Sequence, residues 1–118
     1  MAEDIYKVAV SAPAEYLDIL MDALDEVIEP IYPGYRRCFF ISDVVGTWIP
    51  VEGSTPFLGE IGKISYEEGK RIEFAVRDYD LKEVLRTIDR VHPYEEPAVD
   101  VIPMKAWRSY LWKSDTAP

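Results

Sequence analysis

The chain has 118 residues, 48% of them apolar and 30% charged, which excludes a disordered chain and fits a single domain. Its formal net charge of −9 argues against nucleic acid or an anionic membrane as a partner, because both attract basic surfaces. One cysteine excludes an internal disulfide and favours a reducing cytoplasm. Residues 1–10 lack the pattern of a signal peptide, and no apolar run approaches the roughly 18 residues of a membrane span.

The first part of the chain predicts a strand followed by a helix. Residues 5–10 alternate between apolar and polar positions, as a half-buried strand does. Apolar residues then recur at helical spacing between Pro13 and Pro30, and we expect Ser11 to cap this helix. The apolar stripe of this helix consists of Leu17, Leu20, Met21, Leu24, Val27 and Ile28.

The middle of the chain predicts a short strand, a long loop and a hairpin. Cys38–Ile41 is a short apolar run, whereas residues 42–60 are rich in glycine and proline and show no sustained period. This loop is expected with or without a short strand near Thr47–Ile49. The hairpin is predicted to have arms at Ile61–Tyr66 and Arg71–Val76, with its turn at Glu67–Lys70.

The last part predicts a second helix and a final core strand. Asp80 and Glu83 have the spacing of a capping box, and Pro93 should end the helix. Its apolar stripe consists of Leu81, Val84, Leu85, Ile88 and Val91, and the strand follows at Ala98–Ile102. The order β-α-β-β-α-β indicates an α+β, ferredoxin-like sandwich with a long loop inserted after the second strand.

The segment His92-Pro93-Tyr94-Glu95-Glu96-Pro97 holds the only histidine and joins the second helix to the last strand. The two prolines fix the backbone and should make a stiff corner. We favour a structural role, in which His92 caps the helix or bonds Glu95 and the carboxylates bond backbone amides. The alternatives are a divalent metal or small-anion site, with His92 and Glu95 as metal ligands, and proton transfer.

Several segments resemble a known family in the right order. "YRRCFF", "GTWIPVEGSTPFLGEIG", "RIEF" and "HPYEEPAVDVIPM" are similar to the PII/CutA-like insert domain of the Nif-three-like (YqfO-type) proteins, over roughly residues 5 to 103. The resemblance implies the same ferredoxin-like fold and a precedent for trimers. We therefore expect one stand-alone domain over residues 1–118, with a core at 5–103 and an aromatic tail at 104–118.

Candidate ligand-binding residues lie within these motifs: Cys38, Gly46, Thr47, Trp48, Tyr94 and Glu96. We expect the Cys38 thiol to be buried; the alternative is a thiol made reactive by neighbouring arginines. The glycines lack the lysine and hydroxyl residue of a P-loop. PII proteins bind nucleotide with basic residues, and this chain has no basic residue between Arg37 and Lys63. Nucleotide binding of that kind is therefore not expected.

The leading hypothesis is a non-enzymatic, oligomeric, cytoplasmic binding or regulatory domain that responds to a divalent metal or small ligand at the corner. We assign no catalytic residue. The rival is a metal-dependent, hydrolase-like enzyme using His92 and Glu95, and a third reading is a structural accessory domain. Trp107, Tyr110, Leu111 and Trp112 follow the last core strand and favour self-association, as a trimer or dimer, over a tail folded back on its own sheet.

Overall fold

The structure is a computed structural model that describes the backbone of residues 4–116 and the side chains of residues 4–111. Its elements are β1 (Ile5–Ala12), the 3-10 helix η1 (Ala14–Tyr16), α1 (Leu17–Asp25), β2 (Phe40–Trp48), β3 (Ser65–Arg77), α2 (Asp78–Val91), β4 (Val99–Met104) and α3 (Trp107–Thr116). The predicted order of strands and helices is confirmed as far as β4.

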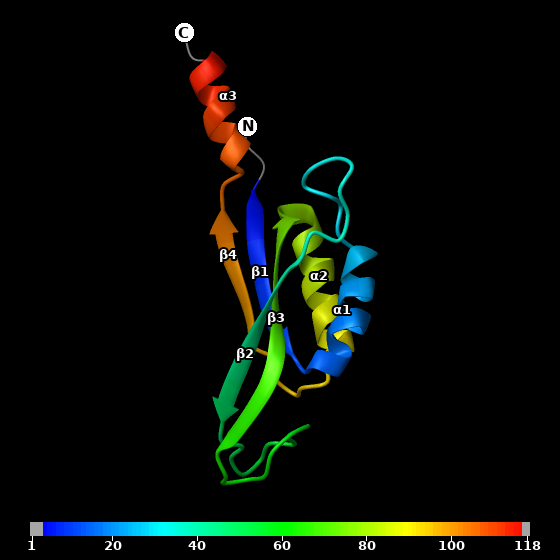
Figure 1. Ribbon diagram of the computed structural model, residues 1–118, viewed down its shortest axis with the longest axis vertical. Coiled ribbons are helices and arrows are strands. Elements are labelled where there is room, and N and C mark those ends of the chain that lie inside the picture. The colour runs from blue at the N-terminus through cyan, green and yellow to red at the C-terminus, as the bar shows by residue number, and fades with distance from the viewer. Residues whose placement is uncertain (1–3, 117–118) are drawn as a thin grey trace.

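The four strands form one antiparallel sheet in the order β2-β3-β1-β4. Both α1 and α2 lie on the same face of this sheet, and the other face is not covered by any described element (Figure 1). Two helices on one face of an antiparallel sheet with this order make the ferredoxin-like α+β fold, so the predicted fold class is confirmed.

The core lies between the helices and the two central strands. The inward residues of β1 and β3 alternate along each strand and pair across the sheet, as Val8 and Phe74 do. The apolar residues of α1 and α2 pack against these strand residues and complete the core. Its buried members are Val8, Val10, Ala12, Leu20, Met21, Leu24, Ile72, Phe74, Val76, Val84 and Ile88.

The predicted hairpin at residues 61–76 is wrong. β3 runs without interruption from Ser65 to Arg77 and passes straight through the segment predicted to turn. Gly69 is responsible for the error, because glycine next to charged residues is typical of a turn. In the sheet this glycine permits a close approach, since a Cβ at position 69 would lie 2.8 Å from the carbonyl oxygen of Ala12.

The second strand is longer than predicted. β2 covers Phe40–Trp48 and takes in part of the segment predicted to be a loop, so the insertion narrows to residues 49–64. β2 is an outer strand of the sheet and most of its residues are exposed. It therefore lacks the alternation of buried and exposed residues from which a strand is recognised.

The predicted helix caps are also wrong. Neither α1 nor α2 begins with a side-chain cap; Pro13 opens η1, and Arg77 precedes α2. Asp80 instead accepts a hydrogen bond from the backbone N–H of Glu29, at 2.9 Å. The first helix ends at Asp25 rather than near Pro30, and Val27 and Ile28 continue its stripe from the following turn.

The molecule is elongated, with principal extents of 62 × 25 × 24 Å. Its radius of gyration is 17.2 Å, whereas a compact domain of this length has about 13.5 Å. The helix α3 continues beyond the end of β4, and the loop 49–64 lies at the opposite end of the sheet (Figure 1). The tail therefore does not fold back on its own sheet, and Trp107 and Tyr110 are exposed.

Candidate functional site at the proline-flanked corner

The corner begins where α2 ends. The backbone N–H of His92 donates to the carbonyl of Ile88, at 2.8 Å, and Pro93 prevents the helix from continuing. The His92 ring then points into the protein and is only 6% exposed. The corner is therefore anchored by its histidine rather than presenting that side chain to solvent.

Both ring nitrogens of His92 have hydrogen-bond partners. Nε2 lies 2.6 Å from the carbonyl oxygen of Ser11, and Nδ1 lies 3.1 Å from the backbone nitrogen of Tyr94. Because a carbonyl only accepts and an amide N–H only donates, the ring carries its proton on Nε2 and accepts at Nδ1. Burial lowers the pKa of His92, although the bond to Ser11 acts in the opposite direction. The histidine therefore joins the corner to β1 as a neutral ring.

Glu95 ties the corner to the inserted loop. Its Oε1 accepts a hydrogen bond from the backbone N–H of Thr55, at 2.9 Å. The sequence predicted that a carboxylate of the corner bonds a backbone amide, and Glu95 does so. The amide belongs to a residue 40 positions away, however, rather than to the corner itself.

Aromatic rings pack around this connection. The ring centroids of Trp48 and Tyr94 are 5.6 Å apart, and those of Phe57 and Tyr94 are 6.1 Å apart. Two further rings extend the cluster: Tyr16 lies 5.8 Å from Phe57, and His92 lies 5.0 Å from Tyr94. The cluster holds β2, the inserted loop and the corner together.

These segments surround a cavity of about 610 Å³, here called the corner cleft. The second half of β2, the first half of β3, the loop and the corner all contribute to it. Its lining residues are Ser11, Ala12, Val44, Val45, Gly46, Thr47, Trp48, Pro50, Ser54, Pro56, Phe57, Leu58, Glu67, Glu68, Gly69, Arg71, Tyr94, Glu95, Glu96 and Ala98.

Six of the predicted site residues come together in the corner cleft, although they stem from two distant segments: Gly46, Thr47, Trp48, Tyr94, Glu95 and Glu96. Phe57, Glu67 and Glu68 are among the lining residues that were not predicted as site residues. The two carboxylates were assigned to the turn of a hairpin that does not form. Phe57 stands in a loop otherwise rich in small and polar residues, and that contrast was the available signal.

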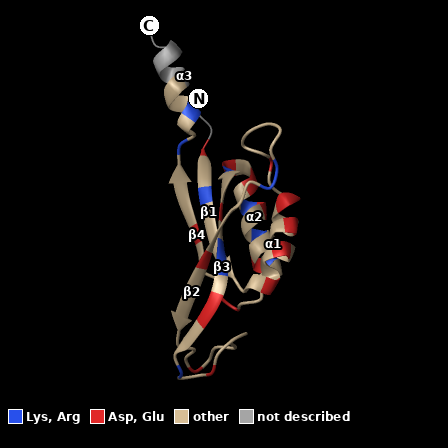
Figure 2. Ribbon diagram, in the orientation of Figure 1, with Lys and Arg blue, Asp and Glu red and all other residues tan. Residues whose placement is uncertain are grey.

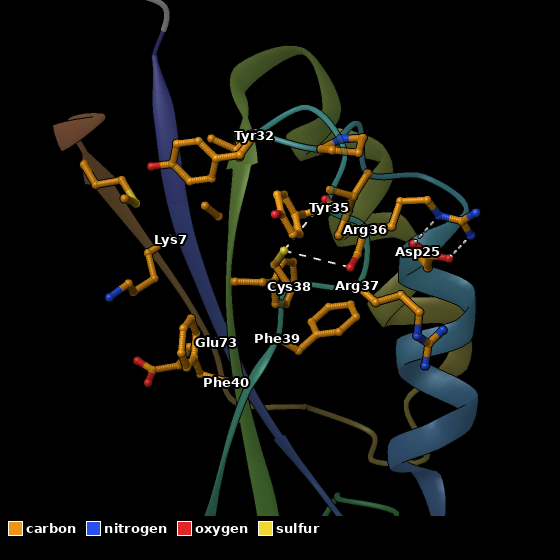
Figure 3. Close-up of a pocket in the computed structure, with 16 residues that line it drawn as sticks. Lys7, Asp25, Tyr32, Tyr35, Arg36, Arg37, Cys38, Phe39, Phe40 and Glu73 are labelled. Atoms are coloured by element: carbon orange, nitrogen blue, oxygen red, sulfur yellow. Dashed lines mark hydrogen bonds and ion pairs between the residues drawn. The ribbon is translucent and has the colours of Figure 1, made fainter. Parts of the chain in front are cut away.

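Cys38 lies elsewhere, and the prediction that it is buried is wrong. The thiol is exposed and sits beside a second cavity, of about 440 Å³, between the 30–39 segment and the sheet (Figure 3). Its Sγ lies 3.7 Å from the carbonyl oxygen of Tyr35. Cys38 precedes β2 and follows Arg37, whose φ of 57° marks a sharp change in chain direction. The apolar run therefore leads into a strand, but Cys38 lies before that strand and outside the core.

The neighbouring arginines turn away from the thiol. Arg36 pairs with Asp25, and Arg37 pairs with Asp22 at 2.8 Å, so both guanidinium groups are directed at α1 (Figure 3). Hydrogen bonding to Arg36 holds the pKa of Asp25 below its usual range. These ion pairs fasten the 30–39 segment to the helix layer.

The corner does not fit a metal site as it stands. A metal ion would take His92 through one of its ring nitrogens, and both are already in hydrogen bonds. Over residues 4–111, whose side chains the structure describes, no three histidine, cysteine or acidic side chains lie where they could share a metal ion. Binding through His92 would require the ring to give up its hydrogen bond to Ser11 on β1 or the one from the amide of Tyr94.

The chain is similar to proteins named GTP cyclohydrolase 1 type 2 homolog. The chain is 33% identical over 105 residues to a GTP cyclohydrolase 1 type 2 homolog of Staphylococcus epidermidis, and 31% identical over 103 residues to one of Bacillus subtilis. These matches cover 89% and 87% of the chain but only 29% and 28% of the relatives. Among solved structures, a Bacillus cereus protein related to NIF3 matches with a TM-score of 0.77 and 30% identity, over 90% of this chain and 27% of that one.

The resemblance to the Nif-three-like family is confirmed. The chain corresponds to a segment of these proteins that is less than a third of their length. CutA from Archaeoglobus fulgidus also matches, with a TM-score of 0.65 over 97% of this chain and 99% of that one, and its 18% identity shows a shared fold. No profile of a known protein family matches the chain. Within residues 4–116, none of the helices has both the length and the apolar character needed to cross a bilayer.

Proposed function

We propose that this chain is a non-enzymatic binding domain with the PII/CutA-like fold, which self-associates and takes up a small ligand in the corner cleft. The observation that carries the proposal is the cleft itself. Its volume of about 610 Å³ falls in the range of small-molecule sites, and its walls come from β2, β3, the inserted loop and the corner. A ligand between them would bind to both the inserted loop and the corner, so that its presence could be transmitted to the sheet.

Self-association is supported by apolar surface that the described part of the chain leaves uncovered. Phe40 on the outer strand β2 is 77% exposed, and Trp107 and Tyr110 on α3 are 55% and 57% exposed. β2 and β4 form the two edges of the sheet, and an edge strand offers unpaired backbone groups to another chain. The proposed assembly is a trimer or a dimer, and the proposed location is the cytoplasm.

The name of the curated relatives refers to an enzyme that acts on GTP. We do not extend that activity to this chain. GTP is strongly anionic, and the lining of the corner cleft has four carboxylates, Glu67, Glu68, Glu95 and Glu96, against the single guanidinium of Arg71. Such a lining repels a triphosphate.

A metal-dependent, hydrolase-like enzyme using His92 and Glu95 is the alternative. The hydrogen bonds that occupy His92 favour the binding domain, because a catalytic metal needs about three protein ligands and an open position. Calorimetric titration with zinc separates the two. We expect no heat that depends on His92, and a binding heat that is present in the wild type but lost in His92→Ala would favour the metal site.

Native mass spectrometry tests the self-association. We expect an assembly of two or three copies at micromolar concentration, both with and without divalent cations. A protein that stays monomeric under these conditions would contradict the proposal.

A further inference from the structure

The charges around the corner cleft are unbalanced. Its four carboxylates are opposed by one lining cation, Arg71, which already lies 3.3 Å from Asp100 outside the cleft. Figure 2 shows the acidic stretch at the start of β3, near the loop that closes this end of the molecule. The cleft therefore has a negative potential that no described lining side chain neutralises.

The same cleft has an aromatic wall. Trp48, Phe57 and Tyr94 all line it, and their rings pack against one another with Tyr94 in the middle. Each ring remains at least partly exposed. Gly46 borders the indole ring, since a Cβ at that position would lie 3.5 Å from Trp48. A flat or apolar group thus has aromatic surface to pack on.

The negative field reaches the aromatic wall. The pKa of Tyr94 is raised, first by burial and then by the charges of Glu67 and Glu15. A negative charge next to Tyr94 is therefore disfavoured, whereas a positive charge there is favoured by the carboxylates and by the faces of the rings.

We propose that the ligand of the corner cleft is an organic cation, with a planar or apolar body that packs on Trp48, Phe57 and Tyr94 and a charged nitrogen group that faces the glutamates. This inference rests on the proposed function and gives its ligand a chemical class. Ammonium, amidinium and guanidinium groups would all satisfy it.

Other classes of ligand fit less well. The described residues offer no cluster of three ligands to a metal ion. A metal ion would also leave the aromatic wall unused. An anion would be repelled by the glutamates. A neutral aromatic molecule could pack on the rings but would leave the negative charge of the glutamates unbalanced.

The test is a titration of the full chain with three probes of the same shape, followed by the backbone amide signals of Gly46, Thr47 and Glu96. The probes are benzamidine, which is a cation, benzamide, which is neutral, and benzoate, which is an anion. We expect saturable shifts with benzamidine, binding at least about tenfold weaker with benzamide, and no saturation with benzoate.

Matched variants locate the effect. Glu96→Gln and Glu67→Gln should each weaken benzamidine about two- to fivefold, the range of an exposed ion pair. Glu83→Gln removes the same charge on α2, outside the cleft, and should leave binding unchanged. Trp48→Leu should weaken binding further, with Tyr66→Leu on β3, also outside the lining, as its control.

The outcomes distinguish the two proposals. Equal binding of benzamide and benzamidine at the same residues overturns the organic cation and leaves the ligand site intact. Benzamidine binding that is unaffected by either glutamate variant also overturns it. An absence of saturable shifts with every probe overturns both the cation and the ligand-binding role, while self-association is judged separately from the native mass.

Discussion

His92 is the only ionisable side chain among the buried residues of the described structure. The sequence indicated a structural role, and the backbone of His92 does close the second helix. Its ring, however, bonds Ser11, which lies 81 positions earlier. No local pattern predicts such a partner, because it depends on how the corner is brought against the end of β1.

Replacing this ring should cost stability. In His92→Ala the carbonyl of Ser11 and the amide of Tyr94 both lose their partner, and we expect the free energy of unfolding to fall by about 2 kcal/mol. Denaturant unfolding of the wild type and the variant measures the difference. Glu96→Ala, an exposed change in the same corner, is the control and should change stability by less than about 0.5 kcal/mol.

The same ring predicts a dependence on pH. Burial depresses the pKa of His92 in the folded state below the unfolded value of about 6.5, so the unfolded chain takes up a proton first as the pH falls. The contribution of His92 to stability should be complete above about pH 6.5 and decline below it.

Since the chain has one histidine, the comparison is direct. Melting temperatures measured between pH 7.5 and 5.5 should fall more steeply for the wild type than for His92→Asn, which cannot titrate there. Parallel curves for the two proteins would show that the ring is not held neutral.

At the scale of the elements, apolar periodicity predicted both helices that cover the sheet. It worked because their stripes face one continuous core, as the buried Leu24 and Ile88 do. It failed on β2, where most residues are exposed, and on the first half of β3, where most residues are only partly buried. In such strands the pairing of the backbone decides the structure, and pairing leaves little trace in the pattern of apolar residues.

A substitution at Gly69 tests whether β3 runs through this position in close contact with β1. Gly69→Ala would put a Cβ 2.8 Å from the carbonyl oxygen of Ala12, and because this is a backbone atom it cannot easily move away. We expect a loss of about 1–3 kcal/mol in the free energy of unfolding.

The matched control is Gly46→Ala in the neighbouring strand. The nearest atom to its new Cβ is a carbon of the Trp48 ring at 3.5 Å, an ordinary contact. Thermal unfolding should rank Gly69→Ala well below Gly46→Ala and the wild type. Equal melting temperatures would mean that the two central strands separate readily at this point.

At the scale of the whole molecule, the sequence predicted the family and the fold. Of the tail residues that it singled out, Trp107, Tyr110 and Leu111 are exposed, and the side chain of Trp112 lies outside the described residues. Six of the residues that line the corner cleft were also predicted as site residues. They were chosen because they belong to the family motifs, and the sequence did not predict that they contact one another. The ion pairs that hold the 30–39 segment on α1, and with them the exposure of Cys38, could not be read from spacing. They depend on where a loop crosses the helix layer.

The tail should contribute to self-association. β4 ends at Met104, so a chain truncated after Lys105 keeps the whole sheet and loses α3 with its exposed Trp107 and Tyr110. We expect the truncated chain to fold but to dissociate at concentrations at least about tenfold higher than the intact chain. Native mass spectra across a dilution series measure this, and unchanged dissociation would place the interface elsewhere.

The elongated shape affects how the molecule moves through water. A particle with extents of 62 × 25 × 24 Å meets more friction than a sphere of the same mass, so a single copy diffuses slowly for its 13.6 kDa. On a gel-filtration column it would leave early, close to the position of a compact globular protein of larger mass. Elution volume would therefore exaggerate the size of the assembly, whereas sedimentation equilibrium, which depends on mass and not on shape, would count the copies correctly.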